Sequence, residues 1–421
     1  MRRILSITLF LLIGCSANIP EIKTTNDDIT SDDFRSHIGY LSSDGLKGRS
    51  SGTEGDKLAK DYIVNHFTNA GLPSKRSVEV QEHYVRISRA SKEKVLTYNI
   101  IATLPGNDDT LKDEYVIIGG HYDSTKNPVF SRNTILDRIN NGADDNGSGT
   151  AMTLELFERY ASLNNHKRTL VFILFGGEEL GLLGSKHYAD NPTVDLDKVQ
   201  LMINLDMVGR LDSEKNVYLG GSPSGKDLEK TIEPFIQASD LNVVSYNYTV
   251  DGVRRLFERS DHYSFYKKDI PVLFFFTGLH PDYHSPRDEA DKVNYEGLKI
   301  ISDLVDKIVL EFANTSEKLL FNAIPDVDEM DSTPPAKMKV TLGVMPDYAY
   351  DGEGLKIDSV IDKRPGSKAG MLDGDIVIDI GGTIIKDIYT YMEVLSKLDS
   401  GSKVEVKVLR NDSEIVLQVK F

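Results

Sequence analysis

Five short segments of this 421-residue chain carry acids and histidines in an order that suits a hydrolytic metal site. They read GGHYDS, GADDNGSG, FGGEELG, NLDMVGR and PDYHSPRD, and their candidate ligands are His121, Asp144, Glu179, Asp206 and His284. Imidazole nitrogen and carboxylate oxygen both bind zinc, and a catalytic zinc ion keeps one position open for water. A carboxylate shared between two ions is a natural arrangement for such ligands. The pattern therefore predicts two zinc ions per chain, with Glu178 beside them to take a proton.

His121 directly follows the apolar run YVIIGG, which predicts a place at the carboxyl end of a strand. Ligand sites of open α/β sheets gather at that edge. Asp123, two residues later, is placed to accept a hydrogen bond from the other ring nitrogen of His121 and so fix its tautomer. A lone histidine after a strand is more often structural, but four further candidates at strand ends favour the metal-binding role.

Two of the segments contain adjacent acids. In GADDNGSG the glycines allow a tight strand-to-helix turn, from which we expect Asp144 to bridge the two ions and Asp145 to support it. In VFILFGGEELGLLGS adjacent side chains diverge, so we expect Glu179 to bind metal while Glu178 acts as general base and acid. The alternatives are an exposed turn or helix N-cap for the first pair, and favourable charges at the start of the next helix for the second.

The last two candidate ligands follow later strands. Asp206 comes after the run VQLMINL and is the expected terminal carboxylate on one ion. His284 lies just after PVLFFFTG and completes the set on the other ion. His280 is close enough in the sequence to compete for that role.

Together these segments resemble the co-catalytic di-zinc aminopeptidase family, whose relatives include glutamate carboxypeptidases and glutaminyl cyclases. The resemblance covers nearly all of residues 31–313 and begins with LKGRSSGTEGDKLAKDYI. The roles that it implies are one ion on His121 and Asp206, the other on Glu179 and His284, a bridge at Asp144 and a proton shuttle at Glu178.

The same resemblance also concerns residues near these ligands. It favours His284 over His280 as the second histidine ligand. Tyr283 matches a position where some bacterial members carry a tyrosine that stabilises the oxyanion of the tetrahedral intermediate, and simple packing is the alternative. In RSDHYSFY, which resembles a segment near the substrate cleft, Asp261 and His262 are expected to be structural or outer residues and not ligands.

The elements that position these residues are expected to form an α/β domain over residues 31–314, with a mostly parallel central sheet flanked by helices. Short apolar runs alternate there with longer segments of helical period. The predicted strands are 97–103, 115–119, 169–175, 199–204 and 272–276, and the predicted helices are 55–70, 149–163 and 295–313.

A second, smaller domain is predicted after a Pro- and Asp-rich linker over residues 315–336. Residues 337–421 resemble a β-rich PDZ domain of bacterial type, in which TLGVM corresponds to the carboxylate-binding loop. The expected strands are 354–360, 375–380 and 403–409, and the expected helices are 366–369 and 389–398. The resemblance implies that Leu342, Gly343 and Val344 bind protein C-termini by strand addition.

The first fifteen residues have the pattern of an export signal. Arg2 and Arg3 precede an apolar run over residues 4–13, which is too short for a spanning helix. LIGC resembles a bacterial lipobox, which implies that Cys15, the only cysteine, is acylated and becomes the mature N-terminus. Residues 16–30 then form a flexible tether. Ser16, and not an aspartate, follows Cys15, which resembles lipoproteins that are sorted to the outer membrane. We therefore expect a lipoprotein of the bacterial envelope, in the outer membrane and facing the periplasm or the surface.

Composition narrows the function classes further. A formal net charge of -16 without a basic stripe disfavours nucleic-acid binding. We expect a metallo-aminopeptidase that hydrolyses N-terminal residues of peptides with metal-activated water. Alternatives on the same fold are a carboxypeptidase and a glutaminyl cyclase with a single zinc ion, although the cyclases typically alter the paired acids of GADDNGSG. A non-catalytic, receptor-like module would lack ligands, and none is missing.

Overall fold

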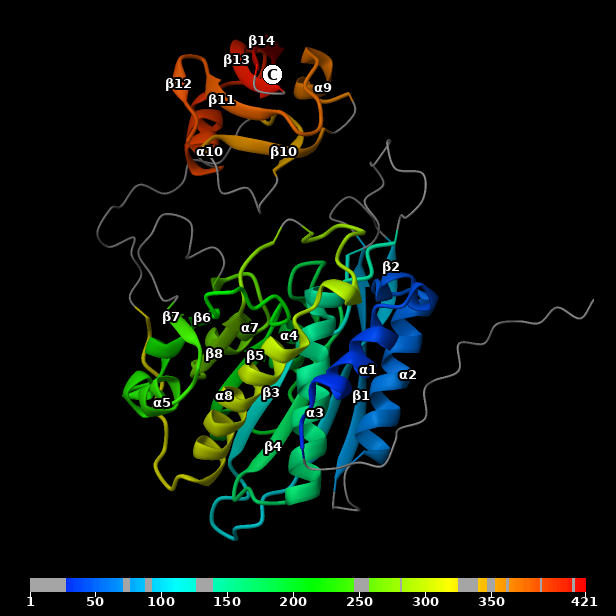
Figure 1. Cartoon of the computed structure of the whole chain (residues 1–421), viewed down its shortest axis with the longest axis vertical. Helices are drawn as coiled ribbons and strands as arrows, with labels where there is room; N and C mark the ends of the chain where they lie inside the picture. The colour runs from blue at the N-terminus through cyan, green and yellow to red at the C-terminus, as the bar shows by residue number, and fades with distance from the viewer. Residues whose placement is uncertain are drawn as a thin grey trace, which may run out of the picture.

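The structure, a computed structural model, describes residues 28–70, 76–87, 93–125, 139–245, 257–280, 282–324, 340–346, 353–360, 363–386, 388–410 and 413–421 (Figure 1). The export signal, the lipidation predicted at Cys15 and all but the end of the predicted tether lie outside these residues. The described residues form two β-sheets, one of eight strands and one of six. Each belongs to one of the two predicted domains, and they are described separately.

The eight-stranded sheet has the order β1-β2-β4-β3-β5-β8-β6-β7. Its strands are β1 (Ser77–Arg86), β2 (Lys94–Leu104), β3 (Tyr115–His121), β4 (Thr169–Phe175), β5 (Val199–Leu205), β6 (Asn216–Gly220), β7 (Asn242–Ser245) and β8 (Val272–Phe276). The four central strands β4, β3, β5 and β8 are mutually parallel, whereas β1 and β2 run antiparallel at one side. The carboxyl ends of the central strands therefore meet at one edge.

Helices cover both faces of this sheet. The larger apolar core lies under α1 (Ser31–Leu41), α2 (Glu54–Asn69), α3 (Gly149–Leu163), α5 (Leu228–Gln237) and α8 (Tyr295–Asn314), and a second core lies under α4 (Leu183–Asp190) and α7 (His262–Tyr266) (Figure 1). Strand β4 serves both cores, because successive side chains point to opposite faces. Leu170, Phe172 and Leu174 pack in the first core, and Val171, Ile173 and Phe175 in the second.

Short helical turns complete the large domain: η1 (Asp44–Arg49), η2 (Ala143–Ser148), η3 (Leu196–Lys198), η4 (Ser222–Ser224) and η5 (Ala290–Lys292). The α/β architecture with a mostly parallel central sheet is confirmed. Strands β4 and β8 and helix α3 have the predicted bounds, while β2 starts at Lys94, earlier than expected. Helix α1 was not predicted, although Thr30 and Asp33 form a capping box at its start.

The six-stranded sheet forms the C-terminal domain and is antiparallel throughout. Its strands are β9 (Val344–Pro346), β10 (Leu355–Val360), β11 (Ile376–Ile380), β12 (Thr383–Ile384), β13 (Lys403–Arg410) and β14 (Ser413–Lys420), with helices α9 (Pro365–Ala369) and α10 (Ile388–Lys397). A separate apolar core, which includes Leu342, Ile357, Leu395 and Val406, lies between them. This arrangement agrees with the predicted small β-rich domain.

The first ten residues of the predicted linker contact the large domain. The segment 315–324 packs along the large domain: Lys226 N donates to Leu320 O at 2.8 Å, and Ile324 N donates to the Tyr266 hydroxyl at 2.9 Å. Ile324 is itself part of the second core. Ile324 is buried in this segment, whereas Leu320 is 52% exposed, so composition gives no sign that the segment packs on the large domain.

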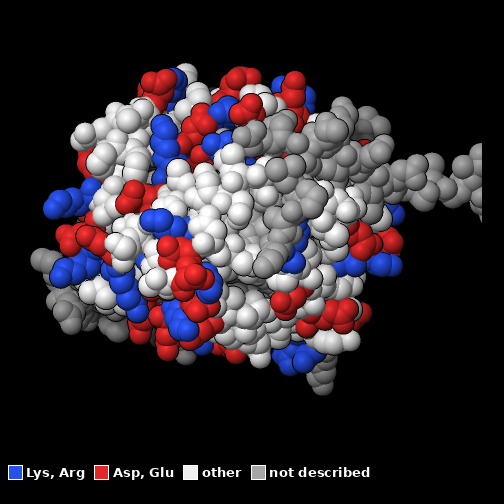
Figure 2. Space-filling view, turned by 90° about the horizontal axis from the view of Figure 1, so that it is seen from below, with Lys and Arg blue, Asp and Glu red and all other residues white. Residues whose placement is uncertain are grey.

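Among the described residues, no helix combines the length and the apolar character needed to cross a lipid bilayer. On the face of the molecule drawn in Figure 2, basic and acidic side chains are interspersed.

Candidate metal centre

Four central strands deliver the site residues to one edge of the sheet. His121 is the last residue of β3 and pairs with Phe175, the last residue of β4, in parallel register. Asp206 directly follows β5, and the loop after β8 carries His280 and His284. Because these strands are parallel and in register, their terminal side chains must converge.

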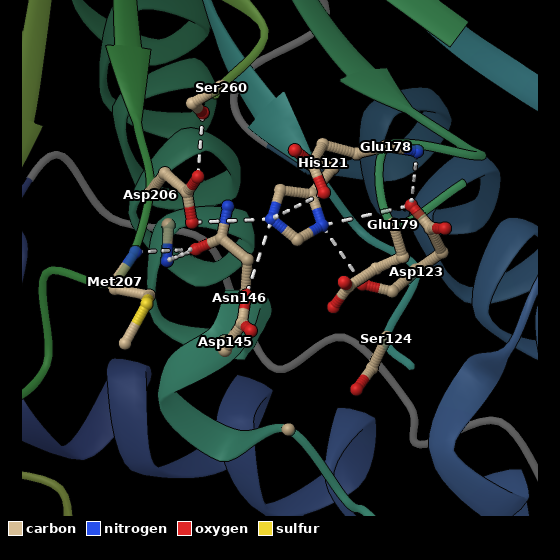
Figure 3. Close-up of polar contacts among 12 residues, drawn as sticks. His121, Asp123, Ser124, Asp145, Asn146, Glu178, Glu179, Asp206, Met207 and Ser260 are labelled. Carbon is tan, nitrogen blue, oxygen red and sulfur yellow. Dashed lines mark hydrogen bonds and ion pairs between the residues drawn. The ribbon is translucent and has the colours of Figure 1, made fainter. Parts of the chain in front are cut away.

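Three overlapping groups of inner residues could each hold a metal ion, and one of them is His121, Glu178 and Glu179. The other two share Asp145 and are called the ligand groups here. The first group is His121, Asp145 and Asp206, and the second is Asp145, Glu179 and His284. His121 Nε2 lies 3.2 Å from Asp206 Oδ1 and 3.4 Å from Asp145 Oδ1 (Figure 3). His284 Nε2 lies 3.0 Å from Asp145 Oδ2 and 3.2 Å from Glu179 Oε2. The two oxygens of Asp145 therefore face one histidine each.

The prediction that Asp144 occupies this shared position is wrong, because the structure places Asp145 there. Asp144 points the other way, where its Oδ1 accepts from Gly209 N at 2.6 Å and from Ser148 Oγ at 2.9 Å. Its Oδ2 lies 3.1 Å from His280 Nε2. Asp144 and His280 thus form a buried pair behind the centre, and His280 is not a member of either ligand group.

Asp123 contacts His121 mainly through its main-chain carbonyl, whereas a contact through its carboxylate was expected. The main-chain carbonyl of Asp123 lies 3.0 Å from His121 Nδ1, whereas its carboxylate Oδ1 is 3.7 Å away. A proton on Nδ1 that is donated to this carbonyl leaves Nε2 free as a ligand. The Asp123 carboxylate instead accepts from Glu178 N at 3.2 Å and from Ser51 Oγ at 2.9 Å. Asp123 therefore orients both His121 and Glu178.

Glu178 lies at the border of the two groups. Its Oε2 is 4.0 Å from His121 Nε2, and only 11% of its side chain is exposed. Burial raises the pKa of Glu178 well above its usual value; the positive charge of His121 opposes this, and Glu179 and other nearby carboxylates add to it. A buried carboxyl with a raised pKa, next to candidate metal ligands, suits proton transfer.

The donor set fits a cationic group. Asp145 Oδ2 and Glu179 Oε1 are buried without a hydrogen-bond partner among the described residues, and the 3.0 Å contact of Asp145 Oδ2 with His284 lacks hydrogen-bond geometry. Burial lowers the pKa of His121, yet the surrounding carboxylates, Asp206 foremost, raise it well above its usual value. The same balance, with Glu179 foremost, raises the pKa of His284. The centre therefore attracts positive charge, as a zinc site would.

An apolar pocket adjoins the centre. Met207, Phe274, Phe276, Leu279 and Tyr283 line it together with Asp206, Ser260 and Arg259. Tyr283 stacks on the His284 ring with the centroids 3.8 Å apart, and burial raises the pKa of its hydroxyl well above the usual value. Tyr283 thus lies beside a candidate ligand, in the wall of the pocket.

Ser260 and Asp261 are adjacent in the sequence but have different environments. Ser260 Oγ donates to Asp206 Oδ2 at 2.6 Å and fixes that carboxylate. Asp261 and His262 are fully buried and belong to neither ligand group, in agreement with the predicted outer role. Burial raises the pKa of Asp261 to about 7.

Sequence reasoning missed two buried residues that hold the site loops. Arg49 is completely buried and donates to four main-chain carbonyls, those of Leu41, Tyr122, Asn141 and Gly142. Asp288 accepts from the main-chain amides of the GADD turn. The segments RSSGTEG and HSPRD contain these residues, but a charged side chain in a loop sequence gives no sign that it will be buried.

The loop predicted to bind peptides in the C-terminal domain is partly buried. The side chains of Leu342 and Val344 pack in the domain core, and Gly343 has a positive φ of 73°. Gly343 N donates to Thr341 Oγ1 at 3.0 Å. Only the main chain of these residues is therefore suited to contact a ligand.

Comparison with known proteins agrees with this geometry. The model of "Peptidase family M28" matches residues 99–309, a segment that contains every residue of the two ligand groups. The chain belongs to peptidase family M28. A PDZ domain model matches residues 337–421, so the M28 domain is followed by a PDZ domain.

Curated relatives share parts of this M28 chain. Aminopeptidase YwaD of Bacillus subtilis is 31% identical over 212 residues, which span 49% of this chain and 42% of that protein. Leupeptin-inactivating enzyme 1 of Streptomyces exfoliatus is 28% identical over 308 residues, 69% of this chain and 61% of that protein. The chain thus spans less than two thirds of either relative.

Solved structures share the fold. The zinc aminopeptidase BSAP of Bacillus subtilis aligns with a TM-score of 0.55 at 20% identity, over 71% of this chain and 100% of that chain. Porphyromonas gingivalis glutaminyl cyclase aligns with a TM-score of 0.55 at 19% identity, over 67% and 98%. At these identities the likeness supports the fold alone.

Proposed function

We propose that this chain is a zinc-dependent aminopeptidase that removes N-terminal residues from peptides. The observation that carries the proposal is the pair of ligand groups that share Asp145, with Glu178 beside them. Two zinc ions are proposed, one on His121, Asp145 and Asp206 and the other on Asp145, Glu179 and His284. When bound there, zinc supplies Lewis-acid polarisation of the scissile carbonyl and activates water at neutral pH.

The protein's own side chains supply the remaining steps. Glu178, whose main chain is held by Asp123, takes a proton from the attacking water and passes it to the leaving amine. The apolar pocket beside Asp206 receives the side chain of the N-terminal residue. The relatives YwaD and BSAP are named aminopeptidases, which supports an aminopeptidase over a carboxypeptidase.

A panel of free and N-acetylated aminoacyl and dipeptide substrates tests the proposal. Wild type should cleave only those with a free amine, and Glu178→Gln should lower kcat about 10²–10⁴-fold. Glu233→Gln, an exposed change on α5, is the matched control and should retain full activity. Cleavage that depends on a free C-terminus would assign a carboxypeptidase instead.

Glutaminyl cyclase is the second candidate, because the Porphyromonas gingivalis enzyme shares the fold. The shared carboxylate Asp145, which faces both histidines, supports two ions over one. Elemental analysis of active protein separates the candidates. About two zinc ions per chain with amino-acid release supports the peptidase, and one ion with pyroglutamate product supports the cyclase.

Two accessory features are also proposed. Acylation of Cys15 would place the enzyme in the bacterial envelope, a proposal supported by the sequence LIGC alone. Labelling with a radioactive fatty acid should mark wild type and spare Cys15→Ala. The PDZ domain would hold protein C-termini near the peptidase, and removal of residues 337–421 should then weaken cleavage of long peptides while short peptides are cleaved as before.

A further inference from the structure

Asp288 is a fully buried acid that belongs to neither ligand group. It lies four residues after His284, and three successive amides of the GADD turn donate to it. Ala143 N donates to the Asp288 main-chain oxygen at 3.1 Å. Asp144 N donates to the carboxylate at 3.0 and 3.1 Å, and Asp145 N donates to Oδ2 at 3.0 Å. Asp288 thus accepts the amide protons of three successive residues, Ala143 to Asp145.

These bonds act on the direction of the Asp145 side chain. Asp145 has extended main-chain angles (φ -103°, ψ 94°) within a helical turn, which is why its side chain diverges from that of Asp144. The Asp288 carboxylate holds the amides of Asp144 and Asp145, which directly precede the Asp145 side chain. Because Asp288 sits on the His284 loop, it also sets the spacing between Asp145 and His284, which are 3.0 Å apart at Oδ2 and Nε2.

Arg210 connects this arrangement to the third ligand segment. It lies four residues after Asp206, and its guanidinium is 3.5 Å from Asp288 Oδ1 and 3.1 Å from Asp282 Oδ2. Only 16% of the Arg210 side chain is exposed. Its main-chain N donates to Thr277 Oγ1 at 3.2 Å, which ties it to the end of β8. Arg210 therefore compensates the buried charge of Asp288 from the Asp206 segment.

We propose that Asp288, supported by Arg210, is a positioning residue that aims the shared carboxylate Asp145 at both metal positions. The inference rests on the proposed metal site, and it adds a determinant of two-ion binding outside the ligands. The isosteric change Asp288→Asn tests it, because asparagine has one acceptor oxygen and its amide group would face a main-chain N–H. Loss of an outer partner of this kind typically lowers metal affinity about 10–100-fold.

The experiment is a titration of metal-free protein with cobalt(II), followed by visible absorption and calorimetry. Asp288→Asn should bind at least one ion about 10–100-fold more weakly and show an altered cobalt spectrum. Its kcat at saturating metal should fall more than KM rises. Asp291→Asn, an exposed acid three residues later, is the matched control and should titrate as wild type does.

Arg210→Gln provides the second variant, in case Asp288→Asn does not fold. Arg210→Gln should weaken the binding of the same ion by a smaller factor. The proposal would be overturned if both variants bound the metal with the affinity and the cobalt spectrum of wild type. It would also be overturned if the variants lost stability without metal but kept their metal affinity. If wild type binds two ions but cleaves no peptide, the proposed aminopeptidase activity is wrong. The titration still decides whether Asp288 positions Asp145.

Discussion

Asp56 is a buried carboxyl whose ionisation should make the stability of the large domain depend on pH. It lies on α2 with no exposed surface and accepts from the Tyr122 hydroxyl at 2.5 Å and from Gly52 N at 2.7 Å. Burial raises its pKa from 3.8 to about 7, and these hydrogen bonds offset only part of that effect. The folded protein therefore holds a proton on Asp56 over a range in which the unfolded chain has released it.

The difference between the folded and unfolded pKa values of Asp56 determines how stability changes with pH. Because the folded-state pKa is raised, the contribution of Asp56 to stability is full below pH 4 and is lost as the pH rises through 7. With about 1.4 kcal/mol for each unit of pKa difference, the loss amounts to an upper bound of roughly 4 kcal/mol. Asp56→Asn mimics the protonated form and removes the titration.

The assay is denaturant unfolding of wild type and Asp56→Asn between pH 4 and 8, with chelator present so that metal binding does not contribute. The stability of wild type relative to the variant should fall by up to about 4 kcal/mol between pH 4 and 7, then level off. Asp61→Asn, whose side chain is 40% exposed on the same helix, is the control for the loss of a carboxyl. A wild-type-minus-variant difference that does not change with pH would refute the reasoning.

Three further predictions concern the site and the residues that hold it. Asp145→Asn should abolish two-ion zinc binding in elemental analysis, whereas Asp144→Asn, which loses only its contact with His280, should retain both ions; equal losses would contradict the assignment. Arg49→Met removes the guanidinium that donates to four buried carbonyls, of which Gly142 O still accepts from Gly147 N, and should lower the unfolding free energy by about 3–5 kcal/mol in urea titrations. A loss below about 1 kcal/mol would show that the loops hold without it. If Tyr283 donates to the oxyanion, Tyr283→Phe should lower kcat about 10²–10³-fold at constant KM, and an unchanged kcat would leave it a packing role.

Much of the fold could be predicted from sequence because its signals are local. Strands β4 and β8 are continuous apolar runs, and helix α3 follows a glycine-rich turn, so their bounds agree with the predictions. Edge strand β1 was missed because its exposed positions alternate irregularly and its pairing with β2 is set by tertiary contacts. The packing of segment 315–324 on the large domain could not be predicted for a similar reason, since burial of Ile324 depends on α7 and not on its own neighbours.

In the candidate site, too, some ligands could be predicted from local sequence and others depend on tertiary contacts. His121 ends β3 and Asp206 directly follows β5, so the parallel register that brings them together could be inferred from the apolar runs that precede them. Which of two adjacent acids points inward is a different question, because neighbouring side chains diverge and a shift of one residue exchanges them. In the GADD turn that choice depends on amides held by Asp288, which lies far away in the sequence. A ligand can therefore be recognised by its segment, whereas its exact position requires the contacts that orient the main chain.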